Sequence, residues 1–252
     1  MATASDKARS FAALHRPGDP LILYNVWDAG SAKTVAEAGA KAIATGSASV
    51  AAAHGFADAE SLPLELALAN AARIAAAVEL PVTVDFEGAY AAGPDAVAAN
   101  VKRLAETGAV GCNFEDQVIG GEGLHPVEAQ SAKIRAAREA VGPDFFINAR
   151  TDIFLKTRAQ THERARIEEA VARARAYAEA GASGFFVPGL VDLDQLAQIC
   201  AASPLPVNFM AFPGAPEAGA VAAAGVARIS HGPFPHKLAM KALKDAAEAI
   251  YG

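Results

Sequence analysis

Short apolar runs alternate with longer Ala-, Glu- and Arg-rich runs along the whole chain. The apolar runs carry β-branched and aromatic residues, which favour strands, and the runs between them favour helices. Strands are predicted over residues 21–28, 42–46, 82–87, 111–116, 145–152, 184–188, 206–211 and 227–232, with a loop and a helical turn over residues 47–53. Helices are predicted over residues 31–38, 64–78, 95–107, 126–141, 162–180, 193–201, 216–224 and 235–251.

Eight strand-then-helix units follow one another without a linker, which predicts a single (β/α)8 barrel over residues 1–252. A glycine follows many of the helices, where a left-handed cap is wanted: Gly39, Gly108, Gly142, Gly181 and Gly225. The alternative is a doubly wound sheet, which usually has a G-x-G-x-x-G turn after its first strand. Residues 25–30 read NVWDAG instead, so the barrel is favoured.

Composition and charge exclude several classes of function. The net charge is −6 and no dense Lys/Arg run occurs, which argues against a nucleic-acid or anionic-membrane surface. The N-terminus has no apolar stretch of a signal peptide, and no apolar run is long enough to span a bilayer. Two cysteines, Cys112 and Cys200, imply a reducing compartment rather than a disulfide framework, so we expect a cytoplasmic protein.

The strand over residues 82–87 ends in two acids on one face. Asp85 and Glu87 are two positions apart, so their side chains leave the strand on the same side. Two unpaired carboxylates inside a buried strand would be costly. We therefore expect both acids at the mouth of a pocket, close to a cation.

The other strands also become polar at their carboxyl ends, where the active sites of barrels lie. The residues concerned are Asn25, Trp27, Asp28, Thr45, Gly46, Ser47, Asn113, Glu115, Asp116, Asn148, Arg150, Asp152, Asn208, Met210, Ser230 and His231. In a barrel these residues converge on one mouth, which indicates a site rather than a set of unrelated loop edges.

Three acids on adjacent strands, Asp85, Glu87 and Glu115, form an oxygen-only donor set. Such a set suits Mg²⁺ or Mn²⁺ better than zinc, with one direct carboxylate and two that act through water. The alternative is a structural ion-pair network. Arg150 can bind a substrate carboxylate or pair with Asp152 or Glu115. With Gly46 and Ser47 as an oxyanion cradle, the set predicts a pocket for a 2-oxo acid or its enolate.

The remaining polar candidates each have a structural alternative. Asn208 can contact substrate or order a loop, and Trp27 can form the pocket wall or belong to the core. His54 and His125 lie in loops, and His231 can be an acid/base group or a cap. We expect substrate contacts from Trp27, Thr45, Gly46, Ser47, Asp85, Arg150 and Asn208, and catalytic roles for Arg150, Glu115, Ser47 and His125.

Several short motifs in this order resemble the isocitrate lyase/phosphoenolpyruvate mutase superfamily over nearly the whole chain. They are residues 45–47 (TGS), 84–88 (VDFEG), 114–117 (FEDQ), 148–152 (NARTD) and 208–210 (NFM). The resemblance implies that Asp85 binds Mg²⁺ directly, that Glu87 and Glu115 hold its waters, and that Arg150 takes the substrate carboxylate. It also implies a homodimer or homotetramer in which the last helix, about 235–251, is swapped between subunits.

The sequence departs from the superfamily pattern at two places. Glu87 stands where Asp is usual, and it still reaches a metal through water. The loop over residues 117–126 lacks the Lys and Cys of isocitrate lyases and the Lys and Asn of phosphonopyruvate-forming mutases. Oxaloacetate decarboxylase-like members need less from this loop, because CO₂ leaves without a proton donor.

The function that we expect from these features is a Mg²⁺-dependent lyase or decarboxylase. Its substrate would be a small 2-oxo or 2-hydroxy dicarboxylate, similar to oxaloacetate or methylisocitrate, and the reaction would pass through a pyruvate-type enolate. Two alternatives remain: phosphonomutase-type C–P chemistry, and a catalytically silent barrel that binds a 2-oxo acid.

Overall fold

The computed structural model describes residues 3–156 and 163–252. Eight strands form one parallel sheet in the order β1-β8-β7-β6-β5-β4-β3-β2. The strands are β1 (Leu21–Leu23), β2 (Ile43–Ala44), β3 (Val82–Asp85), β4 (Gly111–Glu115), β5 (Phe146–Arg150), β6 (Gly184–Phe186), β7 (Val207–Met210) and β8 (Arg228–Ser230). A single parallel bridge between Val26 and Thr45 joins β1 to β2, so the barrel is nearly closed. The predicted (β/α)8 barrel is confirmed.

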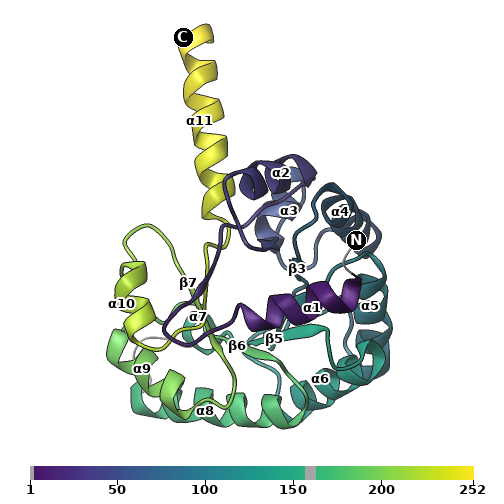
Figure 1. The fold of residues 1–252 in the computed structure, drawn as a ribbon, viewed down its shortest axis with the longest axis vertical. Helices are drawn as coiled ribbons and strands as arrows, with labels where there is room; N and C mark the ends of the chain where they lie inside the picture. The colour runs from purple at the N-terminus through teal and green to yellow at the C-terminus, as the bar shows by residue number, and fades with distance from the viewer. Residues whose placement is uncertain (1–2, 157–162) are drawn as a thin grey trace.

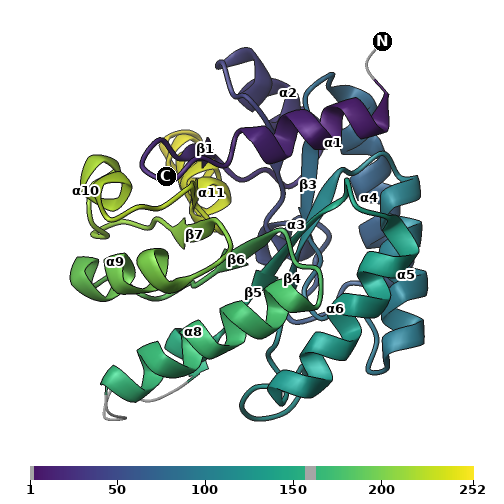
Figure 2. The same cartoon turned by 60° about the horizontal axis from the view of Figure 1, so that its bottom comes forward.

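Helices surround the sheet (Figure 1 and Figure 2). They are α1 (Ala4–Ala13), α2 (Ala29–Glu37), α3 (Ser47–Ala53), α4 (Leu64–Ala77), α5 (Pro94–Glu106), α6 (Val127–Val141), α7 (Ile153–Lys156), α8 (Glu163–Glu179), α9 (Leu193–Ala202), α10 (Ala218–Ala223) and α11 (Phe234–Tyr251). The start of the helix predicted from residue 162 lies outside the described residues. No helix in the described ranges is both long and apolar enough to cross a bilayer.

Helix α1 was not predicted from the sequence. The hydroxyl of Thr3 accepts a hydrogen bond from the Asp6 backbone N–H, and the Asp6 side chain accepts one from the Thr3 N–H, which forms a capping box. Ala8 and Phe11 of α1 pack against Leu21, Val110 and Phe146, which lie at or beside the amino ends of their strands. The helix therefore covers the amino end of the barrel, opposite the ends that carry the acids (Figure 2).

Two further boundaries differ from the prediction. Residues 47–53 form the helix α3 rather than a loop with one helical turn. The first strand ends at Leu23 instead of residue 28. The last residue of the predicted stretch, Asp28, instead caps α2, where its carboxylate accepts a 2.7 Å hydrogen bond from the Ser31 N–H. The five glycines predicted to end helices all have positive φ, between 76° and 100°.

Helix α11 leaves the barrel instead of packing on it (Figure 1). The outward-facing side chains of β1 are consequently uncovered, with Ile22 45% and Tyr24 41% exposed.

Candidate active site

A pocket opens at the carboxyl ends of the strands, where the polar residues converge. Its floor and acidic side come from Asp85 on β3 and Asn113 on β4, and Arg150 on β5 faces them. Within the described residues, the lining is formed by Asn25, Gly46, Ser47, Ala48, Asp58, Asp85, Asn113, Arg150, Leu155, Phe186, Met210, Ser230, Gly232 and Pro233. The convergence that a barrel requires of these strand ends is therefore present.

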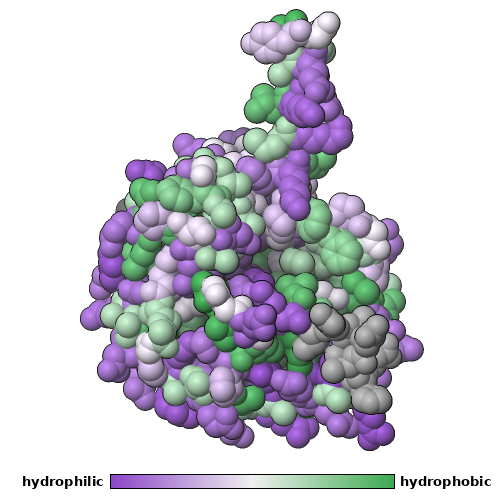
Figure 3. Space-filling view, turned by 180° about the vertical axis from the view of Figure 1, so that it is seen from behind, coloured by the Kyte–Doolittle hydropathy of each residue, from purple (hydrophilic) through white to green (hydrophobic). Residues whose placement is uncertain are grey.

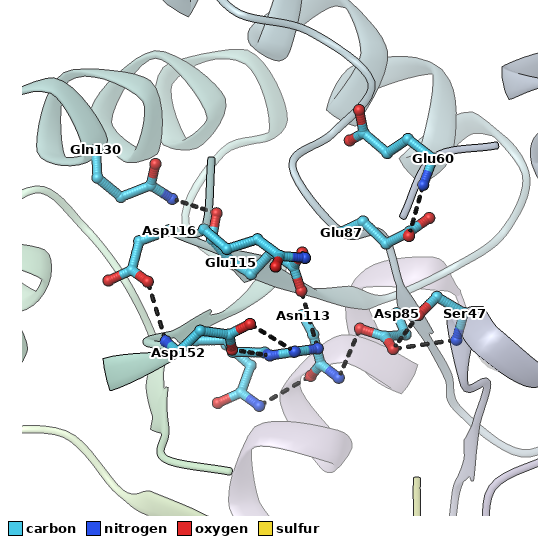
Figure 4. A network of polar contacts seen from close by, with 12 residues as sticks. Ser47, Glu60, Asp85, Glu87, Asn113, Glu115, Asp116, Gln130 and Asp152 are labelled. Carbon is cyan, nitrogen blue, oxygen red and sulfur yellow. Dashed lines mark hydrogen bonds and ion pairs between the residues drawn. The ribbon is translucent and has the colours of Figure 1, made fainter. Parts of the chain in front are cut away.

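The carboxylate of Asp85 is held from both sides (Figure 4). Its Oδ2 accepts hydrogen bonds from the backbone N–H of Ser47 at 3.1 Å and from the Ser47 hydroxyl at 2.9 Å. Its Oδ1 accepts a hydrogen bond from the Asn113 amide at 3.3 Å. The backbone N–H of Asp85 donates to the Thr45 hydroxyl at 2.9 Å. The strand end and the start of α3 thus fix the orientation of this carboxylate.

Glu87 lies in a strained turn directly after β3. Glu87, Ala89 and Tyr90 have φ values of 52°, 62° and 55°, a left-handed conformation that non-glycine residues rarely adopt. The Glu87 side chain accepts hydrogen bonds from the Glu60 N–H at 2.8 Å and from the Tyr90 hydroxyl at 3.2 Å. Burial, aided by the nearby Asp85 and Asp58, raises the pKa of Glu87 to about 7.

Glu115, Arg150 and Asp152 form a buried ion-pair network. Nη1 of Arg150 lies 2.9 Å from Glu115 Oε2, while its Nε and Nη2 donate to the Asp152 carboxylate at 2.6 and 2.9 Å. The two carboxylates outweigh burial and raise the pKa of Arg150, whereas burial raises the pKa of Glu115 against the opposing effect of Arg150. Among the described residues, the guanidinium donates two hydrogen bonds to Asp152 and forms an ion pair with Glu115 through Nη1, which leaves part of its five-donor fork for a ligand.

The residues present suit a hard cation. Asp58 and Asp85 line the pocket, and Glu87 and Glu115 lie beside it. Arg150 is the only basic side chain in the lining among the residues that the structure describes. The donors are all oxygen atoms, which Mg²⁺ and Mn²⁺ prefer. Within residues 3–156 and 163–252, no three His, Cys, Asp or Glu side chains lie close enough together to ligate a metal directly. A site with one direct carboxylate and two that act through water does not require such a cluster.

The loop after β4 folds as a short hairpin. Gln117 and Leu124 form an antiparallel bridge, and the His125 N–H donates to the Asp116 carbonyl at 2.7 Å. Nε2 of His125 lies 3.1 Å from Nζ of Lys133, a buried lysine on α6. Burial and this neighbouring charge lower the pKa of His125, so its ring is neutral at pH 7.

Six predicted site residues lie outside the pocket lining: Trp27, Thr45, Glu87, Glu115, His125 and Asn208. Trp27 packs with Val50 and Leu62, and Thr45 binds the backbone of Asp85 from behind. Asn208 is 1% exposed, and its amide contacts Asn148 and Ser230 below the pocket. Roles of Trp27, Thr45 and Asn208 in substrate binding stay predictions.

Asp58 lines the pocket and was not identified from the sequence. It lies in the segment between α3 and α4, which has no strand periodicity and no position at a strand end. The apolar wall of Leu155, Phe186 and Met210 was likewise not recognised as a unit, because single apolar residues at strand ends resemble core.

Comparisons with known proteins agree with this geometry. The sequence model of the family described as phosphoenolpyruvate phosphomutase matches residues 11–251. A Burkholderia cenocepacia J2315 protein of known structure, provisionally described as a phosphonomutase, is 48% identical with a TM-score of 0.95, and the match covers 98% of this chain and 99% of that one.

Two curated relatives extend the comparison. The uncharacterized protein Rv1998c of Mycobacterium tuberculosis (strain ATCC 25618 / H37Rv) is 36% identical over 242 residues, which is 96% of this chain and 88% of its own length. The 2-methylisocitrate lyase of Escherichia coli (strain K12) is 31% identical over 214 residues, 77% of this chain and 70% of its own length. With a strand-end acid and arginine site on a parallel barrel and a family match over nearly its whole length, this chain belongs to the phosphoenolpyruvate phosphomutase family, within the superfamily that also contains the isocitrate lyases.

Proposed function

We propose that this enzyme is a Mg²⁺-dependent carbon–carbon lyase or decarboxylase that acts on a small 2-oxo or 2-hydroxy dicarboxylate. The observation that carries the proposal is the pairing, in one pocket, of the Arg150 guanidinium with the oxygen donors of Asp85. A 2-oxo acid matches this arrangement, because its carboxylate can bind the arginine and its C2 oxygen can bind a cation held by the acids. The relative named 2-methylisocitrate lyase supports C–C cleavage.

Arg150 binds and orients the substrate carboxylate in this proposal. Asp152 and Glu115 hold the plane of the guanidinium, so the N–H groups that face the pocket are preorganised. Because the pKa of Arg150 is raised, the group stays charged throughout the working pH range.

Asp85 would hold the metal, and Glu87 and Glu115 would hold its waters. The bound Mg²⁺ would supply Lewis-acid stabilisation of negative charge on the C2 oxygen of the substrate. Ser47 now donates two hydrogen bonds to Asp85 Oδ2. If that carboxylate turns toward a cation, both donors are released toward the C2 oxygen, where they act as an oxyanion cradle.

The state of His125 favours decarboxylation. A neutral ring beside the Lys133 ammonium is a poor proton donor. Loss of CO₂ from oxaloacetate needs no proton at the departing fragment, whereas cleavage of methylisocitrate leaves a carbanion that must be protonated.

The test is a substrate screen with Mg²⁺. Oxaloacetate, 2-methylisocitrate and 2,3-dimethylmalate are supplied separately, and pyruvate or other 2-oxo acid release is followed with a coupled dehydrogenase or by NMR.

Arg150→Lys should lower kcat/KM on the order of 100-fold, because the ammonium cannot reproduce the fork. Arg164→Gln on the exposed face of α8 is the matched control and should leave turnover unchanged. Folded protein that turns over none of these acids contradicts the proposal, and tight oxalate binding without turnover would favour the silent barrel.

A second candidate is C–P bond chemistry, which the 48% identical relative favours through its provisional phosphonomutase description. The ³¹P NMR spectrum of phosphonopyruvate incubated with enzyme and Mg²⁺ distinguishes the two. A new phosphate or phosphoenolpyruvate signal supports this candidate, and an unchanged spectrum beside active decarboxylation rejects it.

We also propose that a second copy of the chain covers the open side of the barrel with its α11. Leu238 and Leu243 on α11 are 61% and 63% exposed. Figure 3 shows hydrophobic side chains along the protruding helix. A groove lined by Ile22, Tyr24 and Phe212 lies along β1 and the loop after β7, where a helix is missing. Exchange of α11 between two copies would bury both apolar surfaces.

A further inference from the structure

Arg228 lies inside the barrel, beneath the floor of the pocket. It is the first residue of β8, and Ser230, two positions later on the same face, lines the pocket. Arg228 itself is 1% exposed, and it is the largest of the fully buried side chains. A guanidinium therefore occupies the layer directly below the site.

Barrel interiors are usually filled at this level by branched aliphatic side chains. Here the layer is polar, with Asn113, Asn148 and Asn208 around Arg228. No carboxylate lies within ion-pair distance of Arg228 in the part of the chain that the structure describes, and its Nε and Nη1 have no partner there. Packing alone does not account for this side chain, since an unpaired buried charge is costly.

Among the described residues, the guanidinium of Arg228 makes one hydrogen bond, and it leads to the proposed metal ligand. Its Nη2 donates to Oδ1 of Asn113 at 3.1 Å, and Asn148 donates to the same oxygen at 2.9 Å. Two donors at Oδ1 fix which end of the Asn113 amide is the acceptor. The Nδ2 group must then point upward, where it donates to Asp85 Oδ1 at 3.3 Å (Figure 4).

The electrostatics agree with this geometry. Burial lowers the pKa of Arg228 to about 10, so the group is charged at neutral pH, and Asp85 is the carboxylate whose charge most favours the charged form. The buried cation and the pocket acid are thus coupled both through Asn113 and through space.

We propose that Arg228 is a positioning residue, which orients the Asp85 carboxylate for its metal through the amide of Asn113. The inference rests on the proposed function, because it takes Asp85 as the direct metal ligand. Groups that orient metal ligands affect metal affinity without contacting the metal.

The test measures Mn²⁺ binding to the purified protein by electron paramagnetic resonance, with no substrate and no turnover. Arg228→Met, which keeps the length of the side chain, should weaken Mn²⁺ affinity about 10-fold or more. Thr83→Val is the matched control, since Thr83 lies in the barrel interior two residues before Asp85 and its buried hydroxyl has no partner among the described residues. It should leave the affinity unchanged. A purely structural role for Arg228 would lower stability to urea but not the Mn²⁺ affinity of the folded protein.

A double-mutant cycle with Asn113→Ser tests the relay itself. Once Asn113 is replaced, Arg228→Met should have no further effect on Mn²⁺ affinity. If Arg228→Met does not fold, the same cycle with Arg228→Lys, which retains a buried cation, replaces it. Additive effects in the cycle, or a folded Arg228→Met with wild-type affinity, overturn the inference. The Asp85→Asn variant separates the two proposals. If Asp85→Asn binds Mn²⁺ with wild-type affinity, the proposed metal site is wrong. If Asp85→Asn loses Mn²⁺ affinity while Arg228→Met retains it, only the relay through Asn113 is rejected.

Discussion

At the scale of single residues, Asp116 shows how a group outside the pocket positions one inside it. Its Oδ1 accepts a hydrogen bond from the Asp152 N–H at 3.0 Å, and Asp152 in turn holds Arg150. Its Oδ2 accepts from Arg173 at 3.0 Å and from the Tyr177 hydroxyl at 2.8 Å. Asp116 is fully buried, so its charge depends on these partners.

Removal of one partner should therefore be costly. Arg173→Met leaves the Asp116 carboxylate buried without its counter-charge, and we expect a loss of about 3–5 kcal/mol in the free energy of unfolding. Tyr177→Phe removes one neutral donor and should cost about 1 kcal/mol. Urea denaturation measures both. Arg175→Met, on the exposed face of the same helix, is the control, and an equal loss in this variant would assign the effect to helix propensity instead.

His15 should make stability depend on pH. It stacks on Phe146 with ring centroids 4.1 Å apart, and burial lowers its pKa from about 6.5 to about 3. Between these values the unfolded chain binds a proton that the folded chain does not, so stability is full above pH 6.5 and is lost as the pH falls toward 3. The expected slope is about 1.4 kcal/mol per pH unit.

The measurement compares urea unfolding of wild type and His15→Leu from pH 7 to pH 5. The slope should flatten by about one proton in His15→Leu, whatever its absolute stability. His54→Leu, at the end of α3, is the control for loss of a histidine. A variant slope equal to that of the wild type would show that His15 does not titrate as described.

The residue-scale predictions from the sequence were strongest where position in the barrel determines chemistry. Asp85 and Arg150 come together because the carboxyl ends of the strands meet at one end of the barrel. Both ion pairs considered for Arg150, with Asp152 and with Glu115, are present. Asp58 was missed because a loop without periodicity gives no direction to its side chain. Arg228 was not singled out from the sequence, and only the closed barrel shows that it is buried.

At the scale of elements, strand and helix identities followed from periodicity, but the boundaries did not. The stretch predicted as the first strand runs into the N-cap of α2 at Asp28, and β1 itself ends at Leu23. The stretch from Ser47, predicted as a loop with a helical turn, forms the helix α3. Helix α1 had a signal, the capping box at Thr3 and Asp6, but a short amphipathic stretch without a preceding strand fits no strand-then-helix unit.

The packing of β6 against β5 gives a prediction about Gly184. A Cβ atom at this position would lie 2.7 Å from Asn148 Oδ1 and 2.9 Å from a ring carbon of Phe146. Gly184→Ala should therefore cost about 1–3 kcal/mol, because the polar layer must shift to admit a methyl group. Gly219→Ala is the matched control, since a Cβ there meets nothing within 4 Å and the helix α10 gains propensity. Thermal unfolding of the two variants tests the prediction. Equal stability of Gly184→Ala and Gly219→Ala would show that the polar layer around Asn148 shifts without cost.

At the scale of the whole molecule, a barrel that leaves one outer face of its sheet uncovered needs another surface to complete it. The sequence predicted the helix over residues 235–251, but amphipathic periodicity cannot tell whether a helix packs on its own barrel or on another. The structure separates α11 from the barrel (Figure 1). Ile22 and Tyr24 are exposed, as are Leu238 and Leu243 on α11, so one chain carries two uncovered apolar surfaces. Closure by a second copy satisfies both.

Helix exchange leads to the prediction that charge on the apolar face of α11 dissociates the oligomer. The Leu238→Asp/Leu243→Asp variant would place two carboxylates against Ile22, Tyr24 and Phe212, which is unfavourable without partners. We expect wild type to elute as a dimer or tetramer in size-exclusion chromatography with light scattering, and the variant as a monomer at the same micromolar concentration.

Lys241→Gln, which removes an exposed ion pair with Asp245 on the same helix, should leave the oligomer intact. Because Gly232 and Pro233, directly before α11, line the pocket, Mn²⁺ affinity is measured on this variant as well. A monomeric variant that keeps Mn²⁺ affinity would place the role of α11 in assembly alone. A wild-type monomer, or a variant that stays oligomeric, contradicts the exchange.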